Sequence, residues 1–415
     1  MSEQHEQGTL GLVPSWEERP LLGGEGVDER WRQARRLLLV RLDNLGDVLL
    51  MTPAIRALKR ALPQARLTLL ASPVGAQVGL LNPDLEAVII YEAPWVDPWA
   101  CLPHDSQREQ AMIRCLKERC FDGAIIFTSF RQSALPAAYL CYLADIPLRL
   151  GASLDGSGSL LTTRLRPAPR LMHEVERALE LVAAIGVPPD ERGLVLRVPP
   201  EAHYECATVV SSIGEDAGQT QAQPLIVVHP GCSMPARTYP WELFGATVRL
   251  LVRELGATVC VTGSQQEEEL VARVCACVPS PERQRVLPLA GRLSFAGLCA
   301  LIQRAGLVVT NNTGPMHIAA AVGTPVVALF ALTNPPEQWG PWLVPHRLLY
   351  REVACRLCYQ RCCPNDQLCL RGVSPAEVLA AAADLLGLAA VPARGEGSAE
   401  VDAGRQERRS ERRGA

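Results

Sequence analysis

The feature of this sequence that most constrains its fold is residues 305–330, which predict a strand, a polar turn, a helix and a second strand. The β-branched run at 307–310 is typical of a buried strand, and Pro315 stands where a first helical residue needs no N–H. Gly323 ends the helix, and the apolar run at 326–330 predicts the next strand. The stretch therefore predicts one strand–helix–strand unit of a parallel sheet.

The polar turn inside this unit has the chemistry of an anion site. Its free backbone N–H groups and the positive end of the following helix point to one place, which suits a phosphate. Asn312, Thr313 and His317 add hydrogen-bond donors beside Gly314. Taken alone, however, the pattern is more typical of a capped strand–helix turn with a hydrogen-bonded histidine.

Strands alternate with helices along most of the chain, in two similar halves. One set begins with the apolar strand at 36–42 and the other with the strand at 225–229. Such alternation predicts parallel sheets covered by helices on both faces, with ligands beyond the carboxyl ends of the strands. The fold class is therefore expected to be α/β, and two such halves facing each other form a cleft that favours a ligand.

The expected domain boundaries follow from composition. Residues 1–34 lack hydrophobic periodicity and predict a disordered extension, and residues 188–222 are rich in Pro, Gly, Gln and charge and predict a linker. The two domains are therefore expected at 35–187 and 223–388, with a disordered tail at 389–415.

Charge and hydropathy exclude several classes of protein. A net charge of −3 over 415 residues lacks the basic footprint of a nucleic-acid-binding protein. The sequence shows neither a signal peptide nor an uncharged apolar run of about 18 residues, so we expect a cytoplasmic protein. Contact with the inner face of the cytoplasmic membrane is left open. Many of the 15 cysteines lie in apolar segments, which predicts buried free thiols in a reducing compartment.

Two further turns follow predicted strands and carry reactive groups. In the first, Gly46 permits close approach beside Asp47, whose carboxylate could act as a general base or could only stabilise the helix macrodipole. In the second, the loop 231–233 can present N–H groups to a phosphate, and Arg237 can neutralise charge, although a surface loop with a solvated arginine is the alternative. Because all three turns follow strand ends, together they indicate a phosphate-bearing ligand.

The sequence from Arg41 to Leu58, RLDNLGDVLLMTPAIRAL, resembles the opening of glycosyltransferase family 9, the ADP-heptose:lipopolysaccharide heptosyltransferase family. Residues 229–241, 289–293 and 305–330 resemble the family as well, in the same order. The resemblance implies a glycosyltransferase-B fold with two Rossmann-like domains, the first binding the acceptor and the second the nucleotide-sugar donor. It also implies inversion at the anomeric carbon with no cofactor and no essential metal, and the sequence has no Asp-x-Asp signature.

The resemblance implies roles for individual residues. Asp47 matches the proposed base that takes the proton of the acceptor hydroxyl, with Gly46 on the acceptor side, and Arg237 matches the basic residue that stabilises the leaving diphosphate. Asn312 stands where the family usually has Asp, and the lost charge puts the donor sugar in question. The donor-binding positions implied are Gly231, Cys232, Ser233, Gln265, Glu267, Asn312, Thr313, Gly314 and His317.

The resemblance implies an enzyme that transfers a heptose-like sugar from a nucleotide-diphosphate donor such as ADP-heptose. The acceptor would be a lipopolysaccharide-core, lipid-linked or other cell-envelope glycan. Two alternatives stay open at this stage, namely a nucleotide-sugar 2-epimerase and a non-catalytic nucleotide-sugar-binding protein.

A cysteine-rich segment near the C-terminus has spacing that could ligate zinc. Its candidate ligands are Cys355, Cys358, Cys363 and Cys369, of which only the first two form a regular C-x-x-C pair. Structural zinc, local disulfides and free thiols all remain open, and no metal is assigned.

Overall fold

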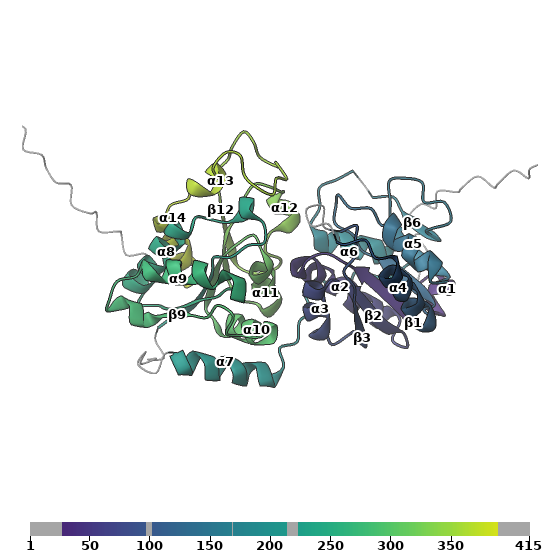
Figure 1. The fold of residues 1–415 in the computed structure, drawn as a ribbon, viewed down its shortest axis with the longest axis horizontal. Helices are drawn as coiled ribbons and strands as arrows, with labels where there is room; N and C mark the ends of the chain where they lie inside the picture. The colour runs from purple at the N-terminus through teal and green to yellow at the C-terminus, as the bar shows by residue number, and fades with distance from the viewer. Residues whose placement is uncertain (1–26, 97–101, 168, 214–222, 389–415) are drawn as a thin grey trace, which may run out of the picture.

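The computed structural model describes residues 27–96, 102–167, 169–213 and 223–388, which form two α/β domains side by side (Figure 1). Each domain contains a six-stranded sheet whose neighbouring strands are all parallel. The first sheet comprises β1 (Arg36–Arg41), β2 (Arg66–Ala71), β3 (Ala87–Ile90), β4 (Gly123–Ile126), β5 (Leu148–Ala152) and β6 (Thr163–Leu165). The second comprises β7 (Leu225–His229), β8 (Thr258–Val261), β9 (Val286–Pro288), β10 (Leu307–Asn311), β11 (Val326–Leu329) and β12 (His346–Leu349). The predicted α/β class is confirmed.

Both sheets have the same strand order. It is β3-β2-β1-β4-β5-β6 in the first domain and, starting from the corresponding edge, β9-β8-β7-β10-β11-β12 in the second. Counted from the first strand of each domain, both follow the Rossmann order. The central strands are apolar along their length because helices cover both faces of each sheet. The order reverses between β1 and β4 and between β7 and β10, so the turns after these four strands border the crevices where ligands bind in such folds.

The helices of the first domain are α1 (Glu29–Arg32), α2 (Leu45–Ala61), α3 (Pro73–Leu80), α4 (Ser106–Glu118), α5 (Leu135–Leu143) and α6 (Glu174–Ala183), and α7 (Pro200–Ile213) follows them. The second domain has α8 (Trp241–Leu255), α9 (Glu268–Ala276), α10 (Phe295–Arg304), α11 (Gly314–Val322), α12 (Pro336–Trp339), α13 (Leu368–Arg371) and α14 (Pro375–Leu385). Three 3-10 turns, η1 (Pro235–Arg237), η2 (Gln265–Glu267) and η3 (Glu282–Arg285), complete it. Helices α2 and α11 pack together where the domains face each other (Figure 1).

The N-terminal boundary differs from the expected one at residue 34. Helix α1 is folded, and the side chain of Trp31 within it is fully buried. It packs against Gly123, where a Cβ atom would lie 2.7 Å from the indole ring. One large aromatic residue anchors the segment, and a single anchor produces no periodicity in the sequence. Residues 1–26 of the expected extension, and the expected tail at 389–415, lie outside the described residues.

The expected linker at 188–222 also differs, because it contains the fourteen-residue helix α7. Ala202, Cys206 and Val210 recur every four residues and are buried. Glu205 accepts hydrogen bonds from the backbone N–H and the hydroxyl of Ser294, both at 2.6 Å, which ties α7 to the start of α10. The polar composition of the segment obscured this short apolar stripe in the sequence.

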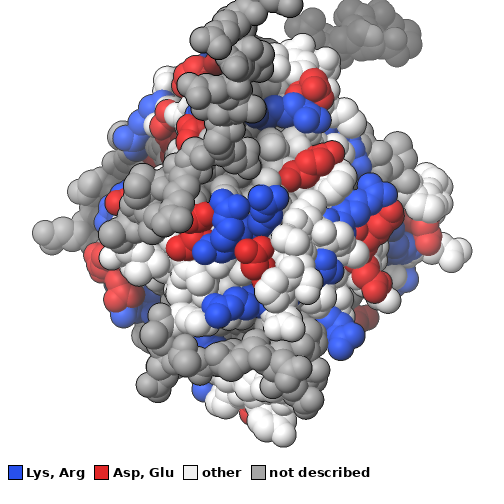
Figure 2. Space-filling model, turned by 90° about the vertical axis from the view of Figure 1, so that its left-hand side faces the viewer, with Lys and Arg blue, Asp and Glu red and all other residues white. Residues whose placement is uncertain are grey.

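Surface charge on the outer face of the second domain is mixed. Figure 2 shows Lys and Arg interspersed with Asp and Glu on that face, with no broad area of one sign among the side chains drawn in colour. Among the helices that the structure describes, none combines the length and apolar character needed to cross a bilayer.

Candidate functional site

The predicted base lies in a cluster of charges at the end of β1. Arg41 is buried, and its Nε lies 2.8 Å from Asp43 Oδ2. Its Nη2 lies 3.0 Å from Asp47 Oδ1 and 3.8 Å from Glu174 Oε2. One guanidinium thus faces three carboxyl groups, and burial raises the pKa of two of them, Asp43 and Glu174.

Asp47 divides its two carboxylate oxygens between two tasks. Oδ2 accepts a hydrogen bond from the backbone N–H of Asn44 at 3.0 Å, which completes a capping box at the start of α2. Oδ1 accepts from Arg41 Nη2 and, at 3.3 Å, from the hydroxyl of Ser129 in the turn after β4. The carboxylate therefore does cap its helix, and its second oxygen is held by side chains rather than by the backbone.

Gly46 brings the first domain against the second. A Cβ atom at this position would lie 2.6 Å from Cδ2 of His317, so only glycine allows the approach. Gly314, at the start of α11, lies beside Leu45, since its own Cβ would be 3.2 Å from the leucine side chain. The positive ends of α2 and α11 thus meet at one place, a suitable position for an anion.

His317 is the most perturbed base in this region. Its side chain is only 4% exposed, and burial, followed by the charges of His173 and Arg237, lowers its pKa to about 3. The imidazole is therefore neutral at physiological pH. Its Nδ1 is buried and has no hydrogen-bond partner in the part of the chain that the structure describes. Because an unpaired buried nitrogen is unfavourable, a ligand group in the gap would stabilise it.

Arg237, in η1 of the second domain, lies near His317 and Asp47. Its Nε donates a hydrogen bond to the hydroxyl of Thr333 at 2.9 Å. Burial lowers the pKa of Arg237, while the charges of Cys232 and of Asp47, in the other domain, raise it. The guanidinium and the Asp47 carboxyl group are therefore close enough to influence each other from one domain to the other.

Asn312 belongs to a chain of hydrogen bonds that ends at Arg237. Its Nδ2 donates to Asn334 Oδ1 at 3.1 Å, and the same oxygen accepts from the Thr333 hydroxyl at 3.2 Å. An aspartate at position 312 could not make this bond, because an ionised carboxylate only accepts. The residue that departs from the family pattern is thus matched to an amide partner in this chain.

The remaining predicted donor residues lie at the edges of this region. Gly231 packs against Glu267, whose Oε1 would lie 1.9 Å from a Cβ at position 231. Glu267 Oε2 accepts from the backbone N–H of Ser264 at 2.7 Å, so this carboxylate caps η2. Gln265 and Ser233 are exposed.

Cys232 lies within the cluster rather than at its edge. Burial raises the pKa of the Cys232 thiol, and the hydroxyl of Thr313 lies within hydrogen-bond reach of it. The loop that carries Cys232 is fastened by Asn311, whose Nδ2 donates to the carbonyl of Pro230 at 2.8 Å and whose Oδ1 accepts from Tyr239 N–H at 2.9 Å. The loop is therefore fixed to the end of β10.

Comparison with known proteins shows the family of this chain. The model described as glycosyltransferase family 9 (heptosyltransferase) matches residues 110–369, more than half of the chain. This chain belongs to glycosyltransferase family 9. The match includes every predicted donor-side residue, whereas Gly46 and Asp47 precede it.

Similar proteins of glycosyltransferase family 9 cover most of the chain. Lipopolysaccharide heptosyltransferase 3 of Escherichia coli (strain K12) is 24% identical over 302 residues, which are 72% of this chain and 82% of that protein. Lipopolysaccharide heptosyltransferase 2 of Salmonella typhimurium is 24% identical over 307 residues, 72% of this chain and 84% of that protein.

Solved structures of the family share the fold. The family 9 glycosyltransferase of Veillonella parvula DSM 2008 superimposes with a TM-score of 0.69 at 22% identity, covering 85% of this chain and 97% of that one. The Escherichia coli ADP-heptose lipopolysaccharide heptosyltransferase II gives 0.67 at 21% identity, covering 85% and 98%. The predicted glycosyltransferase-B architecture is confirmed, and the family shows that the chain is a glycosyltransferase.

The cysteine-rich segment of this family 9 chain lies against the loop that follows β11. Backbone N–H groups of Leu357 and Tyr359 donate to the carbonyls of Leu332 and Thr333 at 2.7 and 2.9 Å. The guanidinium of Arg131, in the first domain, lies 4.4 Å from the centre of the Tyr359 ring. Among the described residues, no three His, Cys, Asp or Glu side chains are placed to hold a metal ion. The four candidate cysteines, Cys355, Cys358, Cys363 and Cys369, are free thiols in the structure.

Several site residues were not predicted from the sequence, namely Arg41, Ser129, Glu174, Asn311, Thr333 and Asn334. Arg41 gave a usable signal, because a charged residue at the end of an apolar strand is unusual. Glu174 and Asn334 gave none, since their partners lie far away along the chain.

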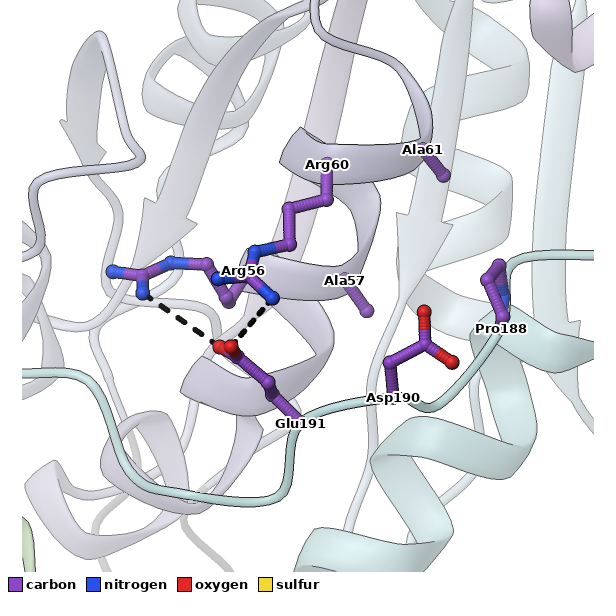
Figure 3. A pocket seen from close by; sticks show the side chains of 7 residues that line it. All are labelled: Arg56, Ala57, Arg60, Ala61, Pro188, Asp190 and Glu191. Carbon is purple, nitrogen blue, oxygen red and sulfur yellow. Dashed lines mark ion pairs between the residues drawn. The ribbon is translucent and has the colours of Figure 1, made fainter.

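Two hollows lie in or beside the first domain, one next to the charge cluster and one away from it. One of about 290 Å³ lies beside Asp43 in the first domain, lined in part by Trp95, Phe127 and Arg131. The other, of about 140 Å³, lies near the far end of α2 (Figure 3). Its arginines are already paired, since Glu191 lies 2.5 Å from Arg60 and 3.9 Å from Arg56.

Proposed function

We propose that this family 9 enzyme transfers a heptose or a similar sugar from a nucleotide-diphosphate donor, such as ADP-heptose, to a lipopolysaccharide-core acceptor. The names of its relatives support this proposal, because they are lipopolysaccharide heptosyltransferases. A solved relative, the Escherichia coli heptosyltransferase WaaC, is described with ADP-2-deoxy-2-fluoro heptose and has a TM-score of 0.56 at 21% identity. An acceptor anchored in a membrane would bring the enzyme to the inner face of that membrane.

The observation that carries the proposal is the position of Asp47 opposite Arg237. In the proposed reaction, Asp47 Oδ1 takes the proton of the acceptor hydroxyl while that oxygen attacks the anomeric carbon. The bond from this carbon to the diphosphate breaks, and its electron pair leaves with the diphosphate. Attack from the side opposite the leaving group inverts the configuration. Arg41 and the hydroxyl of Ser129 hold Asp47 Oδ1 in place for this transfer.

The second domain would stabilise the charge that grows on the departing diphosphate. Arg237 supplies a full positive charge, and the N-terminus of α11 supplies backbone N–H groups. The unpaired nitrogen of His317 supplies a neutral donor, in the tautomer that carries the proton there. We propose that these protein groups suffice, so that no metal ion is essential, and that domain closure excludes water from the cleft.

Replacement of Asp47 by asparagine tests the proposal. The variant keeps the shape but cannot accept the proton, so transfer from ADP-heptose to heptose-free lipopolysaccharide should fall by about 100-fold to 10,000-fold. The measurement is ADP release that depends on acceptor.

A matched control is Asp105→Asn. Asp105 caps α4 on the surface of the same domain, accepting from Gln107 and Arg108 N–H at 3.0 Å. The Asp105→Asn variant should transfer sugar at a rate within about twofold of that of the unmodified enzyme, because surface substitutions away from the site have small effects. Near-normal transfer by Asp47→Asn would refute the assigned base. Donor consumption without acceptor would favour an epimerase, and donor binding without turnover would favour a binding protein.

A further inference from the structure

Glu174 lies between the two domains and contacts both. It is the first residue of α6 and is 3% exposed. Toward the first domain, its Oε2 lies 3.8 Å from Arg41 Nη2, the nitrogen that also donates to Asp47. Toward the second domain, its Oε1 accepts a hydrogen bond of 2.6 Å from Nε2 of Gln338 in α12, itself 2% exposed. A continuous series of contacts thus leads from Gln338 through Glu174 and Arg41 to Asp47.

Other contacts attach the same point of α6 to the second domain. His173, the N-cap of α6, places its Nε2 at 3.0 Å from the carbonyl oxygen of Gly340, two residues beyond Gln338. The His173 ring also stacks on Trp342 with 4.3 Å between ring centres. The start of α6 is therefore positioned by the segment 338–342 of the opposite domain.

The burial of the Glu174 carboxyl group is not explained by local stability. Burial raises the pKa of Glu174 above its ordinary value, and Arg41, Arg177 and the hydrogen bond from Gln338 offset this rise only in part. Its own helix supplies only Arg177, whose Nε is 3.3 Å from Oε1. A neutral side chain could keep the bond to Gln338 without the cost of burying a third carboxylate beside Asp43 and Asp47.

We propose that Glu174 is a positioning residue that sets the Arg41–Asp47 pair when the second domain is seated on the first. Gln338 fixes the Glu174 carboxylate, Glu174 draws the Arg41 guanidinium, and Arg41 holds Asp47 Oδ1. The base is then fully oriented only in the closed enzyme, which limits unproductive chemistry before donor and acceptor are enclosed. This inference rests on the proposed role of Asp47 as the base.

Two variants separate the charge of Glu174 from its bond to the other domain. Glu174→Gln keeps an oxygen for Gln338 but removes the charge, and Gln338→Ala keeps the charge but removes the bond. The control is Glu176→Gln in the same helical turn, where the carboxylate pairs with Arg192 at the surface at 2.8 Å.

The first measurement is kcat as a function of pH, with ADP-heptose and heptose-free lipopolysaccharide. The groups that face Asp47 are Arg41, Asp43 and Glu174 in its own domain and Arg237 in the other. Glu174→Gln removes one negative neighbour, so the acid limb of the profile should move to lower pH while kcat falls about tenfold. Gln338→Ala should lower kcat about threefold to tenfold, and ADP affinity should stay within about twofold in both variants. Glu176→Gln should match the unmodified enzyme.

The second measurement needs no turnover. Asn44 N–H is held by Asp47 Oδ2, so amide exchange at residue 44 reports how firmly the base is held. Exchange there should be faster in Glu174→Gln and Gln338→Ala and unchanged in Glu176→Gln. Unchanged exchange and an unmoved acid limb in both site variants would overturn the inference, as would a loss of kcat that only follows a lowered Tm. Normal transfer by Asp47→Asn would instead refute the proposed role of Asp47 as the base. Failure of the proposed function and failure of the positioning role of Glu174 are therefore distinguishable.

Discussion

The two domains share one strand order, yet the turns at their reversal points carry opposite chemistry. In the first domain, the turn after β1 places Asp43 and Asp47 around a single buried arginine, and the turn after β4 adds the hydroxyl of Ser129. In the second, the turns after β7 and β10 present backbone N–H groups, amides, Arg237 and a neutral histidine. One crevice therefore presents carboxyl groups, and the other presents hydrogen-bond donors and a positive charge.

This difference shows how one fold used twice produces an asymmetric site. Strand order fixes where the turns meet, while a few polar residues in those turns decide what each side does. The contact of Gly46 with His317 then joins the two sides at the ends of α2 and α11. Each prediction below perturbs one side of this comparison.

On the side of the second domain, the largest effect is expected from Arg237→Ala. Because Arg237 is proposed to stabilise the leaving diphosphate, its removal should lower kcat/KM by about 100-fold to 1,000-fold. ADP affinity, measured by calorimetry, should fall about tenfold, because the diphosphate loses a charged hydrogen-bond partner. Arg253→Ala is the control, since Arg253 pairs with Glu254 on the surface of α8. Unchanged ADP affinity in Arg237→Ala would show that Arg237 does not bind the diphosphate.

A smaller effect is expected from Gly46→Ala at the contact between the two sides. The added Cβ would lie 2.6 Å from the His317 ring, so the helices must separate or the ring must move. Overpacking of this kind should destabilise the protein by about 1–3 kcal/mol, measured by denaturant unfolding, and should reduce transfer. Gly193→Ala provides the control, because a Cβ there meets nothing within 4 Å. Equal stability of the two variants would show that the domains are not held this closely.

The smallest effect concerns the pH dependence of stability. The pKa of His317 is lowered to about 3 in the folded chain and returns to the ordinary histidine value on unfolding. The unfolded chain therefore binds a proton that the folded chain does not, so stability is full above the ordinary value and is lost as pH falls toward the folded value. Between about pH 7 and pH 5, the unmodified chain should therefore lose about 1–2 kcal/mol more stability than the His317→Gln variant.

The matched control for that experiment is His203→Gln, because His203 is exposed on α7. Its pH dependence should follow that of the unmodified chain. An identical slope in His317→Gln would mean that the imidazole is not buried as a neutral group.

Much of the fold could be predicted from the sequence, because apolar strands and Gly- or Pro-bounded helices alternate with clear periods. The turns at Asp47, Arg237 and Asn312–Gly314 could be found as well, since each directly follows a predicted strand. The misplaced boundaries have one physical cause. Helix α1 depends on a single buried tryptophan and α7 on a narrow apolar stripe, and neither produces a strong pattern.

The partners of the site residues could not be predicted in the same way. Arg41, Glu174 and Gln338 lie in three separate parts of the chain; folding of the first domain brings Arg41 to Glu174, and packing of the two domains brings Gln338 to Glu174. Asn312 was noticed because it departs from the family pattern, but its bond to Asn334 needed coordinates. Sequence patterns locate the turns, whereas tertiary contacts determine which charges are shared.

The most direct test of the divided site measures transfer and ADP affinity on the same preparation of Asp47→Asn. We expect transfer to fall by about 100-fold or more while ADP affinity changes by less than about twofold. The reason is that Asp47 of the first domain is proposed to take the proton, whereas the second domain is proposed to bind the nucleotide. A parallel loss of both, or transfer close to that of the unmodified enzyme, would contradict this division between the two domains.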